Sequence, residues 1–117
     1  MVLPGGIAWD DLRWEEVKPQ IWRKVFVGER LMMILYRFGP GCRWPEESHE
    51  AEQGGYILKG KILLRLPDEN REVVLGPGQG YWIASKKPHA WEVLDEEVTL
   101  LDIFSPPRFE LLGQERR

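Results

Sequence analysis

Cysteine is nearly absent from this sequence. Cys42 is the only one, so no intrachain disulfide can form and a reducing compartment is expected. Basic clusters are missing as well, since no run of Lys and Arg exceeds two residues and the net charge is −3. Nucleic acids and anionic membranes are therefore not expected as partners, because both bind concentrated positive charge.

Long hydrophobic runs and leader-like segments are also lacking. The longest apolar run covers residues 31–36, far below the roughly 20 residues that cross a bilayer. The first residues have neither the basic nor the apolar region of a signal peptide. We therefore expect a cytoplasmic protein with no membrane partner. With 117 residues, 43% of them hydrophobic, the chain is long enough for one domain with its own core.

What the chain does contain is a series of short apolar segments separated by Gly, Pro and Asn, which is typical of an antiparallel barrel or sandwich. We expect strands at Trp22–Val27, Leu31–Phe38, Gly55–Leu58, Lys61–Leu66, Arg71–Leu75, Tyr81–Ala84, His89–Leu94 and Val98–Phe104. No segment keeps a helical apolar spacing long enough for a core helix. The prediction is one all-β domain over residues 1–117, with an N-terminal arm at 1–20, a barrel at 21–104 and a C-terminal tail at 105–117.

Two features indicate more apolar surface than one sheet face can cover. Residues 31–38 are apolar on both faces of the expected strand, which requires a second sheet or a subunit partner. Six tryptophans in so short a chain favour a packed interface or a ligand cleft. A homodimer is therefore expected, although tryptophans that only fill the core are an open alternative.

Four polar residues have the spacing of a metal site. Glu47 and His49 are two residues apart, and Gln53 is separated from both by an even number, so all three can face one side of a strand. His89 follows a proline at the start of another expected strand, and the chain has no third histidine. This set of nitrogen and oxygen ligands suits one divalent transition metal: Ni, Zn, Mn, Fe or Co. The alternatives are a lost metal site with a solvated Glu47, or Glu46 or Glu50 as the carboxylate ligand.

The same spacing resembles the two motifs of the cupin superfamily. The first motif, Gly-x5-His-x-His-x3/4-Glu-x6-Gly, aligns without gaps from Gly41 to Gly60. The second, Gly-x5-Pro-x-Gly-x2-His-x3-Asn, aligns from Gly78 to Val93. The spacing fits throughout, but only about half of the residue identities do. The resemblance implies a double-stranded β-helix, the cupin jelly-roll barrel.

Within the cupins, the chain resembles the small pectin-degradation (KdgF-like) proteins. Their His-x-His-x-His-Glu-Gln-x-x-Tyr-Val-Leu-x-Gly segment corresponds to residues 47–60 here, and their Leu-Leu-Asp-Val-Phe-Ser-Pro-Pro-Arg segment corresponds to residues 100–108. Gln53 agrees with that family. Glu47 and Ala51 depart from it, because each replaces a histidine.

This resemblance implies an activity and a set of site residues. The family opens a 4,5-unsaturated uronate into a linear 4-deoxy-5-ketouronate, so a small sugar acid is the implied substrate. By position, Asp102 and Arg108 would be catalytic, and Phe104 would face the substrate. Tyr56 and Trp91 are further candidates for substrate binding, at the barrel mouth and beside the second histidine.

Other interpretations of these residues remain open at this stage. A strand-end Asp is often a turn cap or an ion-pair partner, and an Arg after two prolines is often a surface residue. A metal-dependent oxygenase would use a similar site, because cupin centres with open positions also activate oxygen. A cupin that binds a sugar or another small molecule without catalysis is the third possibility.

Overall fold

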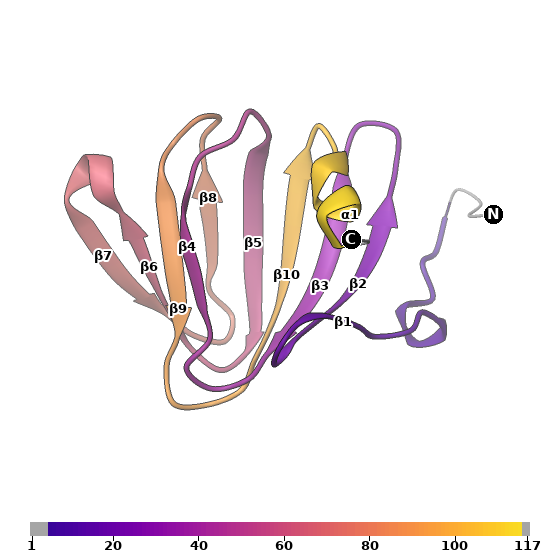
Figure 1. Ribbon diagram of the computed structural model, residues 1–117, viewed down its shortest axis with the longest axis horizontal. Helices are drawn as coiled ribbons and strands as arrows, with labels where there is room; N and C mark the ends of the chain where they lie inside the picture. The colour runs from indigo at the N-terminus through magenta and orange to yellow at the C-terminus, as the bar shows by residue number, and fades with distance from the viewer. Residues whose placement is uncertain (1–4, 116–117) are drawn as a thin grey trace.

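The computed structural model describes residues 5–115, so residues 1–4 and 116–117, the ends of the expected arm and tail, lie outside the described part. The chain forms two antiparallel sheets that face each other (Figure 1). The larger sheet has the order β1-β2-β3-β10-β5-β8 and the smaller one β4-β9-β6-β7. The strands are β1 (Glu15–Lys18), β2 (Ile21–Val27), β3 (Met32–Phe38), β4 (Arg43–Glu47), β5 (Glu52–Lys59), β6 (Ile62–Leu66), β7 (Arg71–Leu75), β8 (Gly80–Ile83), β9 (His89–Val93) and β10 (Val98–Ser105). The predicted all-β fold is confirmed.

Alternation along the strands places the core between the two sheets. In β3, every second residue from Met32 to Phe38 is buried, and in β10 every second residue from Val98 to Phe104 is buried. The two strands are neighbours in the larger sheet, with Asp102 opposite Ile34. Asp102 therefore shares the inward face with apolar side chains, an orientation that the alternation of the sequence alone did not decide.

Two strands and an α-helix were not expected from the sequence. β1 lies inside the segment expected to be an N-terminal arm, and it pairs with β2. β4 contains Pro45 and several charged residues, but it is an edge strand whose pairing with β9 shifts between Trp44 and Glu47, and edges and bulges tolerate proline. A helix, α1 (Phe109–Glu115), follows the two prolines of the expected tail, and its Leu111 is buried.

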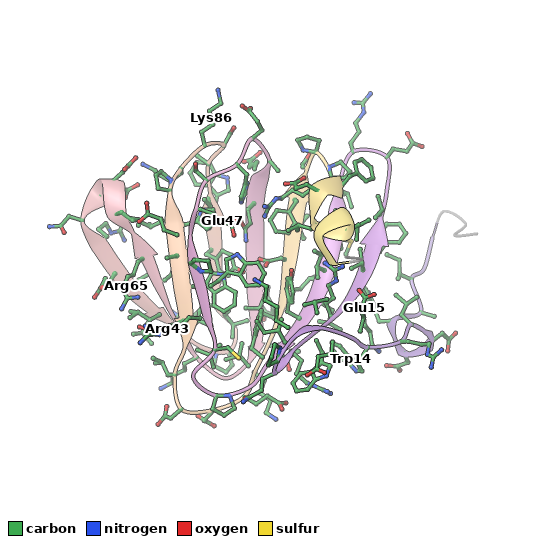
Figure 2. The ribbon with its side chains drawn as sticks, in the orientation of Figure 1. Trp14, Glu15, Arg43, Glu47, Arg65 and Lys86 are labelled. Atoms are coloured by element: carbon green, nitrogen blue, oxygen red, sulfur yellow. The ribbon has the colours of Figure 1, made fainter. Side chains whose placement is uncertain are left out.

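The outer faces of the two sheets differ in character. The smaller sheet is charged there: Arg65 contacts Glu72 and Glu92, and Glu92 also contacts Arg43 (Figure 2). On the larger sheet, the N-terminal segment packs against β2 and β3. The Lys24 ammonium donates a hydrogen bond to the Trp9 carbonyl oxygen, and the Trp14 ring lies beside Lys24 and Arg37. Further along, β5, β8 and β10 expose apolar side chains: Tyr56, Leu58, Trp82 and Ile103. Among residues 5–115, no helix has the length and apolarity to cross a membrane.

Candidate metal centre and substrate pocket

A narrow pocket lies between the two sheets. Its lining combines aromatic, acidic, basic and imidazole side chains from both sheets and from α1: Tyr36, Trp44, Glu47, Gln53, His89, Trp91, Asp102, Phe104, Arg108 and Leu111. Mixed linings of this kind, with a few convergent polar groups on an apolar wall, are typical of small-molecule sites.

Two backbone carbonyls orient the histidines. His49 follows β4 in the turn to β5, and its Nδ1 lies 2.8 Å from the Ala51 carbonyl oxygen. His89 begins β9, and its Nδ1 lies 2.9 Å from the Lys87 carbonyl oxygen. A carbonyl only accepts hydrogen bonds, so Nδ1 of each ring carries the proton and donates it. Each neutral ring then has its lone pair on Nε2, which is the arrangement of a metal-binding imidazole.

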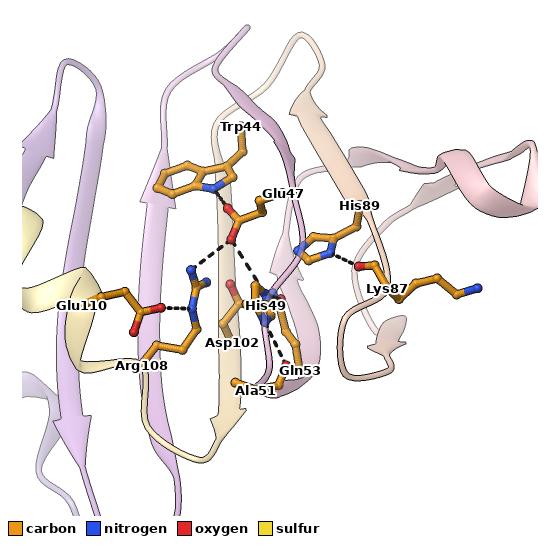
Figure 3. Close-up of polar contacts among 10 residues, drawn as sticks. All are labelled: Trp44, Glu47, His49, Ala51, Gln53, Lys87, His89, Asp102, Arg108 and Glu110. Atoms are coloured by element: carbon orange, nitrogen blue, oxygen red, sulfur yellow. Dashed lines mark hydrogen bonds and ion pairs between the residues drawn. The ribbon is translucent and has the colours of Figure 1, made fainter.

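Three acceptor atoms converge at His49 (Figure 3). Its Nε2 lies 3.2 Å from Oε1 of Gln53 and 3.7 Å from Oε1 of Glu47. The side-chain amide of Gln53 is fixed in this orientation, because a flip would lose the hydrogen bond of 3.0 Å that its Nε2 donates to Oδ1 of Asp102. Burial lowers the pKa of His49, and the nearby Arg108 charge lowers it further, so the neutral ring is favoured. A neutral ring leaves these lone pairs facing one another with no proton between them.

A cation placed among these acceptor atoms would be ligated by their lone pairs. Glu47, His49 and His89 each offer one ligand atom, and these atoms all lie within 4.8 Å of one another. Together with the Gln53 oxygen they supply two imidazole nitrogens, one carboxylate and one amide oxygen. This donor set fits a divalent first-row metal without selecting one. The two histidines, 40 residues apart in the sequence, are brought together because β4 pairs with β9, with Glu47 opposite His89.

Glu47 has two further partners, and their contacts were not expected from the sequence. The Trp44 indole donates a hydrogen bond to Oε2 of Glu47, and Nη2 of Arg108 lies 3.0 Å from Oε1. Both carboxylate oxygens are therefore held. No sequence signal predicts the pairing with Arg108, because that residue reaches the pocket only through the turn after β10.

Asp102 is buried beneath these ligands, and it is held by Tyr81 and Gln53. Burial raises the pKa of Asp102 from 3.8 to about 6, although the hydrogen bonds from Tyr81 and Gln53 to Oδ1 oppose that rise. Burial likewise raises the pKa of the Tyr81 phenol well above 10.0, and the Asp102 charge is the second cause of that rise. A carboxyl group that titrates near neutral pH suits proton transfer. Sequence reasoning identified Asp102 but missed Tyr81.

The candidate substrate residues divide into two groups. Phe104 is buried, with its ring 5.8 Å from that of His49 and 5.1 Å from the Arg108 guanidinium carbon. Trp91 is also buried and stacks on Trp44 at 5.7 Å. Both line the pocket. Tyr56 does not, because it alternates with buried neighbours on β5 and lies on the outer face of the sheet, 49% exposed.

The fold and the pocket define a single-domain β-barrel protein with a candidate metal centre between its two sheets. Residues 34–104 match the family model described as a cupin domain. The chain belongs to the cupin family.

Individual relatives agree with this assignment. The chain is 30% identical over 105 residues to the pectin degradation protein KdgF of Dickeya dadantii (strain 3937), which covers 88% of this chain and 94% of that protein. It is similar to the structure of KdgF from Halomonas sp., with a TM-score of 0.80, 27% identity, and 87% and 93% of the two chains covered. An RmlC-like cupin from Shewanella frigidimarina NCIMB 400 shares the fold, with a TM-score of 0.82 at 18% identity over 94% and 96% of the chains. The resemblance to KdgF-like cupins is thus confirmed.

Proposed function

We propose that this protein opens the ring of a 4,5-unsaturated uronate and yields the linear 4-deoxy-5-ketouronate. The observation that carries the proposal is the meeting of three groups in one pocket: the candidate metal ligands, the buried Asp102 and the Arg108 guanidinium. The similarity to pectin degradation proteins supports the choice of a sugar acid as substrate.

The residues that would hold a metal are Glu47, His49, Gln53 and His89. When bound, a divalent metal acts as a Lewis acid that stabilises negative charge on substrate oxygens. Arg108 offers a planar guanidinium that matches the carboxylate of a uronate. Its side chain is 12% exposed and stacked on Phe104, so it is held at the pocket wall. Phe104 and Trp91 supply the apolar wall against which a sugar ring can pack and exclude water.

Asp102 is the group that moves protons. The hydrogen bonds from Gln53 and Tyr81 fall on Oδ1, so Oδ2 is the oxygen that exchanges a proton with a ligand. In the reaction, the anomeric hydroxyl loses its proton to Asp102 and the bond between C1 and the ring oxygen breaks. C1 becomes an aldehyde. The ring oxygen becomes the C5 carbonyl when C4 gains a proton, and Asp102 can return the one it took. The step is an isomerisation, so it needs no oxidant and no water.

The test is to follow the ultraviolet absorbance of the conjugated double bond while the protein is incubated with unsaturated galacturonate. Loss of absorbance that requires Asp102, with Asp102→Ala as the comparison variant, supports the proposal. Two results contradict it: unchanged kinetics in that variant would remove the role of Asp102, and recovery of the tightly bound uronate unchanged would indicate a binding protein. Oxygen uptake coupled to turnover would instead indicate an oxygenase.

A further inference from the structure

One oxygen of Glu47 lies between the Arg108 guanidinium and the candidate metal ligand His49. Oε1 is 3.0 Å from Nη2 of Arg108 and 3.7 Å from Nε2 of His49 (Figure 3). The other oxygen, Oε2, is bound by the Trp44 indole. The carboxylate oxygen on the side of the metal ligands is therefore the same oxygen that neutralises Arg108.

Solvent screens this ion pair only weakly. The side chains of Arg108 and Glu47 are 12% and 22% exposed, so their charges act over a short distance in a partly desolvated pocket. The second acidic partner of Arg108 is Glu110, which binds Nε at 3.0 Å but is 53% exposed. Glu47 is thus the inward carboxylate in direct contact with the guanidinium, whose charge also acts on the buried Asp102. A metal bound at Glu47 would share that counter-charge with Arg108 and would be repelled by it.

We propose that Arg108 makes the binding of the metal and of a sugar acid mutually dependent. Without a ligand, the ion pair between Arg108 and Glu47 weakens metal binding. A uronate carboxylate that takes over the guanidinium releases Glu47 to the metal. Because such coupling is reciprocal, the metal increases the affinity for the sugar acid by the same factor. The inference rests on the proposed function for the metal and for the uronate class of ligand.

The dependence of metal binding on the sugar acid arises from a residue at which this chain departs from the cupin motif. Glu47 occupies the position at which the cupin motif has a histidine. A neutral imidazole at that position would ligate a metal but would form no ion pair with Arg108. The variant Glu47→His therefore keeps a ligand at position 47 and removes the competition, which makes it the matched control for the wild type.

The experiment is a calorimetric titration of Ni²⁺ into metal-stripped protein, with and without saturating D-galacturonate, a saturated uronate that has no double bond to react. Galactose, which lacks the carboxylate, is the ligand control. In the wild type, galacturonate tightens Ni²⁺ binding by roughly five- to tenfold, and galactose has no effect. In Arg108→Gln, Ni²⁺ binds more tightly than in the wild type without any ligand, and galacturonate adds nothing. Glu47→His likewise shows no dependence on galacturonate.

Three results overturn the inference. Ni²⁺ affinity in the wild type that does not change with galacturonate removes the coupling. Coupling that persists in Arg108→Gln assigns it to direct contact between sugar and metal. Weaker Ni²⁺ binding in Arg108→Gln than in the wild type shows that the ion pair does not compete. If thermal unfolding shows that Arg108→Gln does not fold, Glu47→His replaces it in the second result, because that variant also lacks the ion pair. The titration does not measure turnover, so its result is independent of the ring-opening assay. Coupling without ring opening would contradict only the proposed function. Ring opening without coupling would contradict only this inference.

Discussion

Gly55 lies directly opposite Tyr81 in the pairing of β5 with β8, and the Tyr81 ring occupies the space that a Cβ of Gly55 would need. Gly55 is also opposite Asp102 in the pairing of β5 with β10. The missing side chain at Gly55 therefore lets the Tyr81 hydroxyl pass across β5 and donate its hydrogen bond to Asp102.

The Gly55→Ala variant is expected to displace the Tyr81 ring. Overpacking of this kind costs roughly 1–3 kcal/mol, so chemical denaturation should show a lower free energy of unfolding. Gly54→Ala is the matched control, because the nearest atom to a Cβ at Gly54 is a backbone oxygen at 3.9 Å. Equal stability losses in the two variants would contradict the role of the Tyr81 ring.

The Tyr81→Phe variant removes a hydrogen bond that lowers the pKa of Asp102. The pKa of Asp102 should therefore rise above its value of about 6 in the wild type. The measurement is an NMR titration of the Asp102 side-chain carboxyl carbon, or the acid limb of the pH profile of ring opening. A shift of that limb to lower pH would show that the Tyr81 hydroxyl does not stabilise the ionised carboxylate.

The Asp102→Asn variant tests the cost of burying the carboxylate. In the folded protein the pKa of Asp102 is raised from 3.8 to about 6, chiefly by burial. The folded state therefore holds this proton more tightly than the unfolded state, and the carboxyl contributes stability at acid pH that is lost as the pH rises through about 6. The difference between 3.8 and about 6 corresponds to about 3 kcal/mol at most.

An amide at position 102 can still accept both hydrogen bonds, but it does not ionise. The free energy of unfolding of the Asn variant, relative to that of the wild type, should therefore increase as the pH is raised from about 4 to about 8, by up to about 3 kcal/mol. Urea denaturation of metal-stripped protein at both pH values measures the change. A stability difference that stays constant across this range would show that Asp102 does not ionise at a cost in the folded protein.

The histidines should dominate metal affinity. His49→Gln and His89→Gln each remove one of two imidazole ligands, and each is expected to weaken Ni²⁺ binding by at least roughly tenfold. Glu50→Gln is the control, since Glu50 is 78% exposed and pairs with Lys86, while the carboxylate that converges with the histidines is that of Glu47. A loss in the Glu50 variant as large as in the histidine variants would reopen the choice of carboxylate ligand.

Much of the fold could be predicted from local patterns in the sequence. Alternation of apolar and charged residues in β6, and Gly, Pro and Asn between the strands, indicated the strands and the all-β class, because side-chain direction in a strand follows from position alone. β4 escaped prediction because its charged, proline-containing sequence is stable only as an edge strand beside β9. The spacing of Glu47, His49, Gln53 and His89 also indicated the candidate metal ligands, although Glu47, His49 and Gln53 lie on β4, in the next turn and on β5 and not along one strand.

The contacts that tune the pocket depend on tertiary structure. Tyr81 reaches Asp102 only because β5 lies between β8 and β10 and has a glycine at the crossing point. Arg108 meets Glu47 because the turn after β10 returns to the pocket beside β4. Tyr56 points away from the pocket, although the sequence made it a candidate for the barrel mouth. These relationships join residues from strands far apart in the sequence, and no local pattern encodes them. Sequence spacing thus named the candidate ligands, while the order of the strands in the sheets decided which charges and hydrogen bonds surround them.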